Sequence, residues 1–191
     1  MTAMNTKKFA EAYGQALAVC RYLEDGFKAD FPKSLTEVVN NPGFECESFL
    51  KLLNYDVLLS NQIFQFFKLV TILADCSLMS KPIERLDLRP HLLQVVKLII
   101  CNPLRTCIEN GSEMLAESFP VAIAKLTLLL PEKPKSVTDR EMYLEFYLLW
   151  LPKWFGFYPD LKSKVLNNLP IANNAENSWL GKISTAYSQI D

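Results

Sequence analysis

Residues 57–79 constrain the fold of this chain more than any other segment. They form its richest apolar stretch, which is interrupted by Asn61, Gln62, Gln65, Lys68 and Asp75. A helix that crosses a membrane needs about twenty mostly apolar residues, so these interruptions argue against a membrane span. Helices that are apolar around most of their circumference are buried inside larger proteins. We therefore expect residues 57–79 to form the central buried helix of a soluble fold.

Helix signals recur along the rest of the chain. Residues 34–37 and 138–141 match the capping box that opens a helix. Prolines, which suit the first turn of a helix and end the one before it, divide residues 83–130 into three or four short helices. A short strand at 125–130 is the weaker alternative to a helix there. The prediction is an all-α fold, a compact irregular bundle of about eight to ten helices around residues 57–79.

Length and composition favour a single folded domain. The chain has 191 residues, of which 50% are hydrophobic, and a net charge of −1. This apolar content excludes intrinsic disorder, and the balanced charge argues against a strongly basic nucleic-acid binder. We predict one helical domain over residues 1–191. Residues 131–136 hold two prolines and no apolar side chain beyond them, so a junction between subdomains would fall at this linker.

The cysteines bear on the cellular compartment. Their number is odd, no two are separated by only two residues, and each lies beside apolar residues: Cys20, Cys46, Cys76, Cys101 and Cys107. This pattern is typical of buried, reduced thiols rather than of a disulfide framework. No apolar run follows the basic pair near the N-terminus, as a secretory signal would require. We expect a cytoplasmic protein.

Few residues could carry catalysis or hold a metal. His91 is the only histidine, which excludes zinc sites made of several histidines. The six glycines are scattered and form no phosphate-binding loop. Glu141 and Glu145 share a helix face, and we interpret them as the solvated edge of an amphipathic helix rather than as an acid–base pair. The prediction is a protein with no catalytic residues, no cofactor and no metal.

Aromatic side chains are concentrated in residues 143–158, which hold eight of them. They form a second layer of the core, a surface that binds a partner, or a platform for bases or a membrane interface beside Lys153, Lys162 and Lys164. Because Pro152 disrupts helices, we expect the helix to end at Leu151 and some of the later rings to point away from the core. The candidate partner-binding residues are Trp150, Trp154, Phe155, Phe157 and Tyr158.

These features favour a binding protein over an enzyme. The expected function is that of a non-catalytic helical adaptor, a chaperone-like binder or a structural subunit of a larger assembly. Its aromatic surface would engage an amphipathic helix or another apolar segment of a protein partner. The main alternative is a helical subunit of a complex that handles nucleic acid, although the isolated chain is not expected to bind nucleic acid. An enzyme without a recognisable motif is the third alternative.

Overall fold

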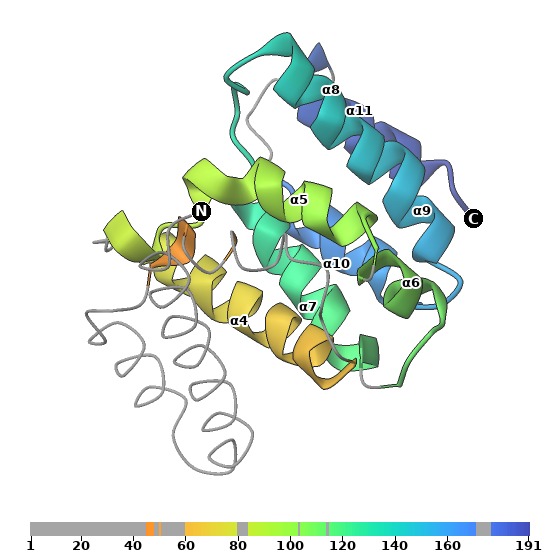
Figure 1. The fold of residues 1–191 in the computed structure, drawn as a ribbon. Coiled ribbons are helices and arrows are strands. Elements are labelled where there is room, and N and C mark those ends of the chain that lie inside the picture. The colour runs from red at the N-terminus through yellow and green to blue at the C-terminus, as the bar shows by residue number, and fades with distance from the viewer. Residues whose placement is uncertain are drawn as a thin grey trace. The chain divides into compact units, whose positions relative to one another are not determined.

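The computed structural model describes residues 45–47, 50, 60–79, 84–102, 104–113, 115–170 and 177–191. In chain order, the elements are α4 (Ser60–Leu78), η1 (Glu84–Leu86), η2 (Arg89–His91), α5 (Leu92–Ile100), α6 (Leu104–Glu109), α7 (Leu115–Leu128), α8 (Val137–Glu145), η3 (Phe146–Trp150), α9 (Leu151–Trp154), α10 (Leu161–Asn168) and α11 (Trp179–Ser188) (Figure 1). The described residues contain no strand, so the all-α prediction is confirmed for them.

The helix count differs from the prediction. Because α8, η3 and α9 follow one another without a gap, they form one continuous helix, which we call the rod. The described residues then hold seven α-helices, fewer than the eight to ten predicted for the whole chain. The capping box at 34–37 lies outside the described residues. Within the part that is described, no helix has both the length and the hydropathy that a membrane crossing requires.

The chain divides into two compact units, Met1–His91 and Leu92–Asp191. In the first unit, α4 covers most of the predicted buried segment 57–79, of which 57–59 are not described. Most of its described apolar side chains are buried as predicted, and Phe66 and Phe67 are at most 1% exposed, but Leu78 at its end is 43% exposed.

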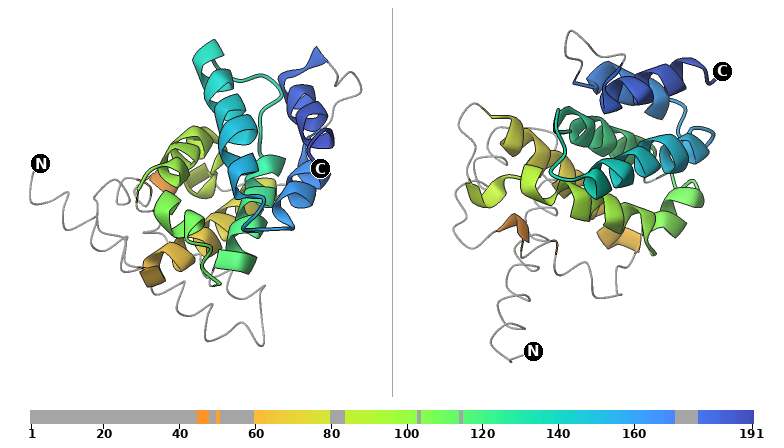
Figure 2. Two further views of the ribbon diagram at one scale, coloured as in Figure 1. Left: turned by 90° about the vertical axis from the view of Figure 1, so that its right-hand side faces the viewer. Right: turned by 90° about the horizontal axis from the view of Figure 1, so that it is seen from above.

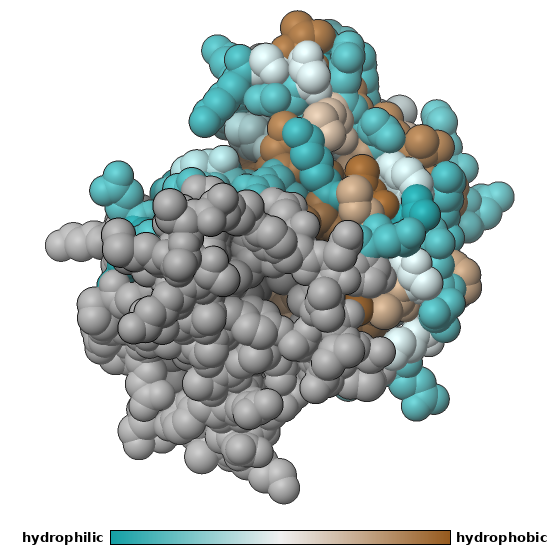
Figure 3. Space-filling view, in the orientation of Figure 1, coloured by the Kyte–Doolittle hydropathy of each residue, from teal (hydrophilic) through white to brown (hydrophobic). Residues whose placement is uncertain are grey.

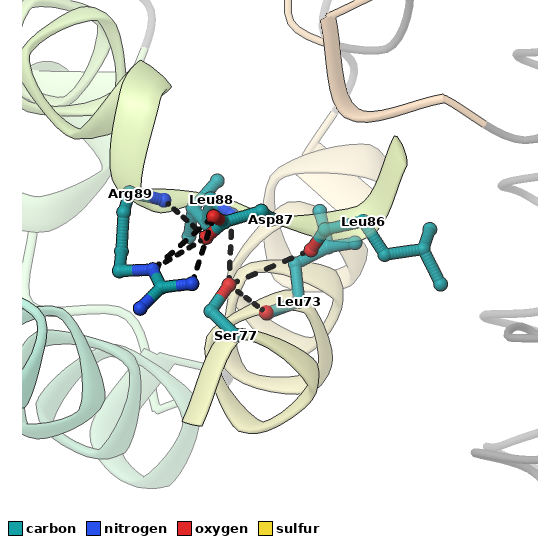
Figure 4. A network of polar contacts seen from close by, with 6 residues as sticks. All are labelled: Leu73, Ser77, Leu86, Asp87, Leu88 and Arg89. Carbon is teal, nitrogen blue, oxygen red and sulfur yellow. Dashed lines mark hydrogen bonds and ion pairs between the residues drawn. The ribbon is translucent and has the colours of Figure 1, made fainter. Parts of the chain in front are cut away.

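One serine attaches the chain that follows α4 to the last turn of that helix. Ser77 is buried, and its hydroxyl donates to the carbonyl of Leu73 at 2.7 Å. The same oxygen accepts the N–H of Leu88 at 2.7 Å (Figure 4). Next to this contact, Arg89 makes an ion pair with Asp87 at 2.9 Å. The buried hydroxyl is thus satisfied both as donor and as acceptor, as buried polar groups require.

In the second unit, α7 packs along α10, and both helices turn apolar residues inward. The helical reading of residues 125–128 is confirmed, because α7 runs through them. Pro120 was expected at a helix boundary but lies inside α7. A proline there leaves the carbonyl of Ala116 without its usual donor. Because Ala116 is exposed, water can satisfy that carbonyl and the helix continues.

The rod begins and ends differently from the prediction. Its N-cap is Ser136 rather than Thr138, and the Ser136 hydroxyl accepts the N–H of Asp139 at 3.0 Å. The rod also does not end at Leu151 but continues past Pro152 to Trp154. It widens into a π turn at η3, where the N–H of Leu151 donates to the carbonyl of Phe146, five residues back. We attribute this turn to the proline, whose ring would otherwise collide with the carbonyl four residues before it.

Two further elements complete the second unit. The linker predicted at 131–136 is mostly exposed and joins α7 to α8. The last helix, α11, lies against α8 and η3, as the views in Figure 2 show. The rod is therefore packed on several sides, and this packing decides which of its aromatic rings can reach solvent.

Candidate functional site

The five aromatic residues predicted to bind a partner differ in their exposure. Trp154 and Tyr158 are 0% and 2% exposed, so they cannot contact a partner in this structure. Trp150 and Phe155 are partly buried, and Phe157 is 50% exposed. The expectation that the rings after Pro152 point outward therefore needs correction for Trp154, because the rod continues through the proline and keeps this side chain on its buried face.

Trp154 belongs to an aromatic cluster between α7 and the rod. Its indole meets the ring of Phe119 edge-on, with centroids 5.8 Å apart. Phe119 also contacts Tyr158 at 5.0 Å, and Phe146 approaches Trp154 at 6.4 Å. Aromatic pairs in such tilted and edge-on arrangements add stability beyond the area they bury. These rings therefore form a second layer of the core, which is the first of the three interpretations of the aromatic segment.

The polar tips of two cluster residues hold α6 in place. The indole nitrogen of Trp154 donates to Oε1 of Glu109 at 3.4 Å. The hydroxyl of Tyr158 donates to the carbonyl of Ile108 at 2.9 Å. Burial raises the pKa of Tyr158 to about 12, so the hydroxyl keeps the proton that it donates. These contacts tie the last turn of α6 to the end of the rod through Trp154 and to the segment after the rod through Tyr158, a role that the sequence pattern did not indicate.

Tyr147 carries a second buried polar contact. Its hydroxyl lies 2.9 Å from the hydroxyl of Thr127, which itself donates to the carbonyl of Ile123 at 2.7 Å. Tyr147 is therefore the donor to Thr127. Burial raises the pKa of Tyr147, so the hydroxyl keeps the proton that it donates. Such a fully satisfied contact positions the rod on α7 without offering a reactive group.

Trp179 joins α11 to the rod and to the linker. Its ring stacks on Tyr143 with centroids 5.6 Å apart, and its indole nitrogen donates to the carbonyl of Glu132 at 3.0 Å. Beside it lies an open cavity of about 440 Å³, whose lining includes three cations: Lys133, Lys135 and Arg140. This cavity is open to solvent, in contrast to the enclosed clefts that typically hold small molecules.

The exposed part of the aromatic segment centres on Trp150. Nζ of Lys153 lies 4.6 Å and Cζ of Arg105 lies 5.7 Å from the centroid of its ring. The preceding Leu148 and Leu149 are 38% and 49% exposed. We call these five residues the Trp150 surface. Hydrophobic patches show on the face of the molecule where the rod runs (Figure 3).

Sequence reasoning missed Arg105, Leu148 and Leu149. The prediction for this segment was confined to aromatic residues, so it left out both leucines. A regular helix advances by about 100° per residue, which places Leu148 and Leu149 well away from the face that carries Tyr147. In the structure both leucines are exposed and Tyr147 is buried. No signal in the chain near Arg105 pointed to its place over an indole 45 residues away.

The lysines beside the aromatic segment do not offer three free cations. Lys153 lies over Trp150, and Nζ of Lys162 donates to the carbonyl of Ile190. Lys164 is partly buried in α10. A platform for single-stranded nucleic acid would present such charges along a groove, and two of these three side chains have partners within the chain.

Thiol exposure agrees with the expectation only in part. Cys46 and Cys76 are buried free thiols, and burial raises their pKa values to about 12 and about 11. Cys101 is exposed and Cys107 is partly exposed, so the expectation of buried thiols is wrong for Cys101. Cys20 lies outside the described residues.

The residues that the sequence analysis considered for catalysis are Glu141, Glu145 and His91. Glu141 and Glu145 are both exposed, and Glu145 accepts the indole N–H of Trp150 at 3.3 Å. His91 is partly exposed at the end of η2. The described portion of the chain holds no group of three or more His, Cys, Asp or Glu residues that could bind a metal ion.

Comparisons with protein-family models, with curated proteins and with solved structures find no match for this chain.

Proposed function

We propose that this chain is a non-catalytic helical protein that binds another protein, as an adaptor, a chaperone-like binder or a structural subunit of a larger assembly. The observation that supports the proposal is the Trp150 surface, where a half-buried indole with two cations at its ring stands next to two exposed leucines. Tryptophan and arginine are the residues most enriched among those that dominate binding energy at protein interfaces.

The composition of this surface suits an apolar partner segment. Leu148 and Leu149 offer apolar area, and Trp150 adds a large rigid ring. Arg105 and Lys153 can form ion pairs with carboxylates of the partner at the edge of the interface. Glu145 accepts the hydrogen bond of the Trp150 indole nitrogen. An amphipathic helix, with apolar residues at three- and four-residue steps, is the form of partner that helical proteins commonly receive. Phe157 is the residue predicted from the sequence that remains half exposed.

The proposal includes two broader features. We infer a cytoplasmic protein, which the buried free thiols Cys46 and Cys76 support. We also infer that the full chain forms one bundle around residues 57–79, which the complete burial of Phe66 and Phe67 supports. Both inferences fit a subunit of an intracellular assembly.

The test compares two exposed leucines that lie on different helices, one inside the Trp150 surface and one outside it. The full chain, tagged and expressed in its native source, carries Leu149→Asp in the rod or Leu128→Asp in α7, where Leu128 is 38% exposed. Each variant is isolated, and the proteins that co-purify are quantified by mass spectrometry. We expect Leu149→Asp to lose partners that the Leu128→Asp control retains, with equal melting temperatures. Equal amounts of every co-purifying protein in the two variants and the parent would contradict the proposal.

A further inference from the structure

The turn between α6 and α7 contains an exposed asparagine followed by a glycine. Asn110 comes directly after the last residue of α6, and both Asn110 and Gly111 are exposed. Gly111 has a φ of +61°, the one positive φ in the described part of the chain. Only glycine adopts this conformation without strain. The turn therefore requires a glycine after Asn110, and a glycine has no side chain that could block attack on the asparagine by its main-chain nitrogen.

We propose that Asn110 is a site of spontaneous deamidation, in which the peptide nitrogen of Gly111 is the nucleophile. This nitrogen loses its proton and attacks Cγ of the Asn110 side chain, so that a new N–Cγ bond forms. The Cγ–Nδ2 bond breaks, and ammonia leaves with a proton taken from solvent. The five-membered succinimide that results is hydrolysed by one water molecule, to aspartate if water opens the Cγ side or to isoaspartate if it opens the main-chain carbonyl side. No oxidant, metal or further reactant takes part.

The structure shows what this reaction must overcome. The N–H of Gly111 donates to the carbonyl of Ile108 at 3.1 Å, and the N–H of Asn110 donates to the carbonyl of Thr106 at 3.0 Å. The attack therefore requires the last turn of α6 to open. That helix has only six residues, and the ends of helices open at far lower free energy than the core of a domain. The two hydrogen bonds thus slow the deamidation of Asn110, and the rate of this reaction depends on how often the last turn of α6 opens.

The products would alter the contacts that hold α6. A carboxylate at position 110 places negative charge at the C-terminal end of a helix, where the helix dipole disfavours it. Isoaspartate also lengthens the main chain between Asn110 and Gly111. A Cβ on Gly111 would lie 3.5 Å from the Phe157 ring, at ordinary contact distance, so a longer main chain here would move against that ring. The neighbouring bonds from Tyr158 to Ile108 and from Trp154 to Glu109 would weaken with the displaced turn.

An internal control distinguishes this mechanism from general hydrolysis of asparagine. Asn102 is also exposed but precedes Pro103, whose nitrogen carries no hydrogen and cannot become the nucleophile. The full folded chain is incubated at mildly alkaline pH and 37 °C, then digested, and both peptides are quantified by mass spectrometry. Chromatography separates the aspartate and isoaspartate forms at position 110.

We expect Asn110 to be converted progressively during the incubation, with isoaspartate among the products, while Asn102 remains an amide. The Asn110→Gln variant should lose this signal, because a glutamine would have to form a slower six-membered ring. An Asn110 that persists in the folded chain, or that converts no faster than Asn102, would overturn the proposal.

Discussion

The hydroxyl of Tyr187 in α11 donates a hydrogen bond of 2.5 Å to the main-chain carbonyl of Tyr147 in the rod, forty residues away along the chain. Both side chains are buried. In the π turn, the carbonyl of Tyr147 would pair with the nitrogen of residue 152, five positions on. That residue is Pro152, which has no N–H to donate. The tyrosine of α11 thus replaces the bond that the proline removes, and the two features depend on each other.

Removing this hydroxyl should destabilise the protein. Tyr187→Phe leaves the Tyr147 carbonyl buried without a donor, which costs about 1–3 kcal/mol. The matched control is Tyr143→Phe, because Tyr143 is also buried and makes ring contacts, with its hydroxyl in no hydrogen bond of the described structure. Denaturant unfolding followed by tryptophan fluorescence measures both variants. Equal free energies of unfolding for the two variants would mean that the bond contributes nothing.

A double-mutant cycle tests the dependence on the proline. In a Pro152→Ala background, residue 152 regains an N–H that can reach the Tyr147 carbonyl. We therefore expect Tyr187→Phe to cost less there than in the parent, with a coupling of about 0.5–3 kcal/mol, the range for residues that share a partner. Additive effects of the two substitutions would contradict the account of Pro152 as the cause of the missing donor.

This interdependence explains how far the sequence could predict the structure. Local signals were sufficient in part: the prolines of residues 83–130 predicted three or four short helices, and α5, α6 and α7 lie there, although Pro120 is inside α7 and not at its boundary. The π turn was missed because its unpaired carbonyl is satisfied by Tyr187, a contact between distant segments. The exposure of Leu148 and Leu149 agrees with a regular helical period, and both were missed because the prediction considered only aromatic residues as partner contacts.

Cysteine reactivity should separate the buried thiols from the exposed one. The raised pKa values of Cys46 and Cys76, about 12 and about 11, keep both as unreactive thiols at pH 8, whereas Cys101 is exposed. Alkylation of the folded chain at this pH, followed by peptide mapping, should label Cys101 first and Cys46 and Cys76 only after unfolding.

The same shifts predict how stability changes with pH. A thiol whose folded pKa is raised contributes stability that is fully present below the unfolded pKa of about 8.5. That contribution is lost as the pH rises from there toward 11 and 12, because the unfolded state releases the proton first. Cys46→Ala should flatten this alkaline decline in the free energy of unfolding. A decline of the same slope in the variant and the parent would assign it to other groups.

Nucleic-acid binding by the isolated chain should be weak. The net charge is −1, Lys153 lies over Trp150, and Lys162 donates to a main-chain carbonyl. The positive charge of the chain is therefore balanced overall, and two of the lysines nearest the aromatic segment are engaged within the chain, so we expect little release of counterions from a phosphate backbone. Fluorescence anisotropy with a short labelled single strand at about 0.15 M salt measures this. Tight binding that weakens steeply with added salt would favour the alternative of a subunit that handles nucleic acid.

Two aromatic residues of the same segment should respond oppositely to substitution. Trp154 is 0% exposed among Phe119, Phe146 and Trp150, so Trp154→Ala opens a cavity and costs about 3–5 kcal/mol. Phe157 is 50% exposed, and Phe157→Ala should cost less than about 1 kcal/mol.

Chemical unfolding and co-purification of partners are measured on the same two variants. Phe157→Ala should reduce partner recovery at nearly unchanged stability, because its ring is free to contact a partner, whereas any loss with Trp154→Ala should follow the unfolded fraction. Full partner recovery with Phe157→Ala would restrict the interface to the Trp150 surface, and a large loss of stability in that variant would return its ring to the core.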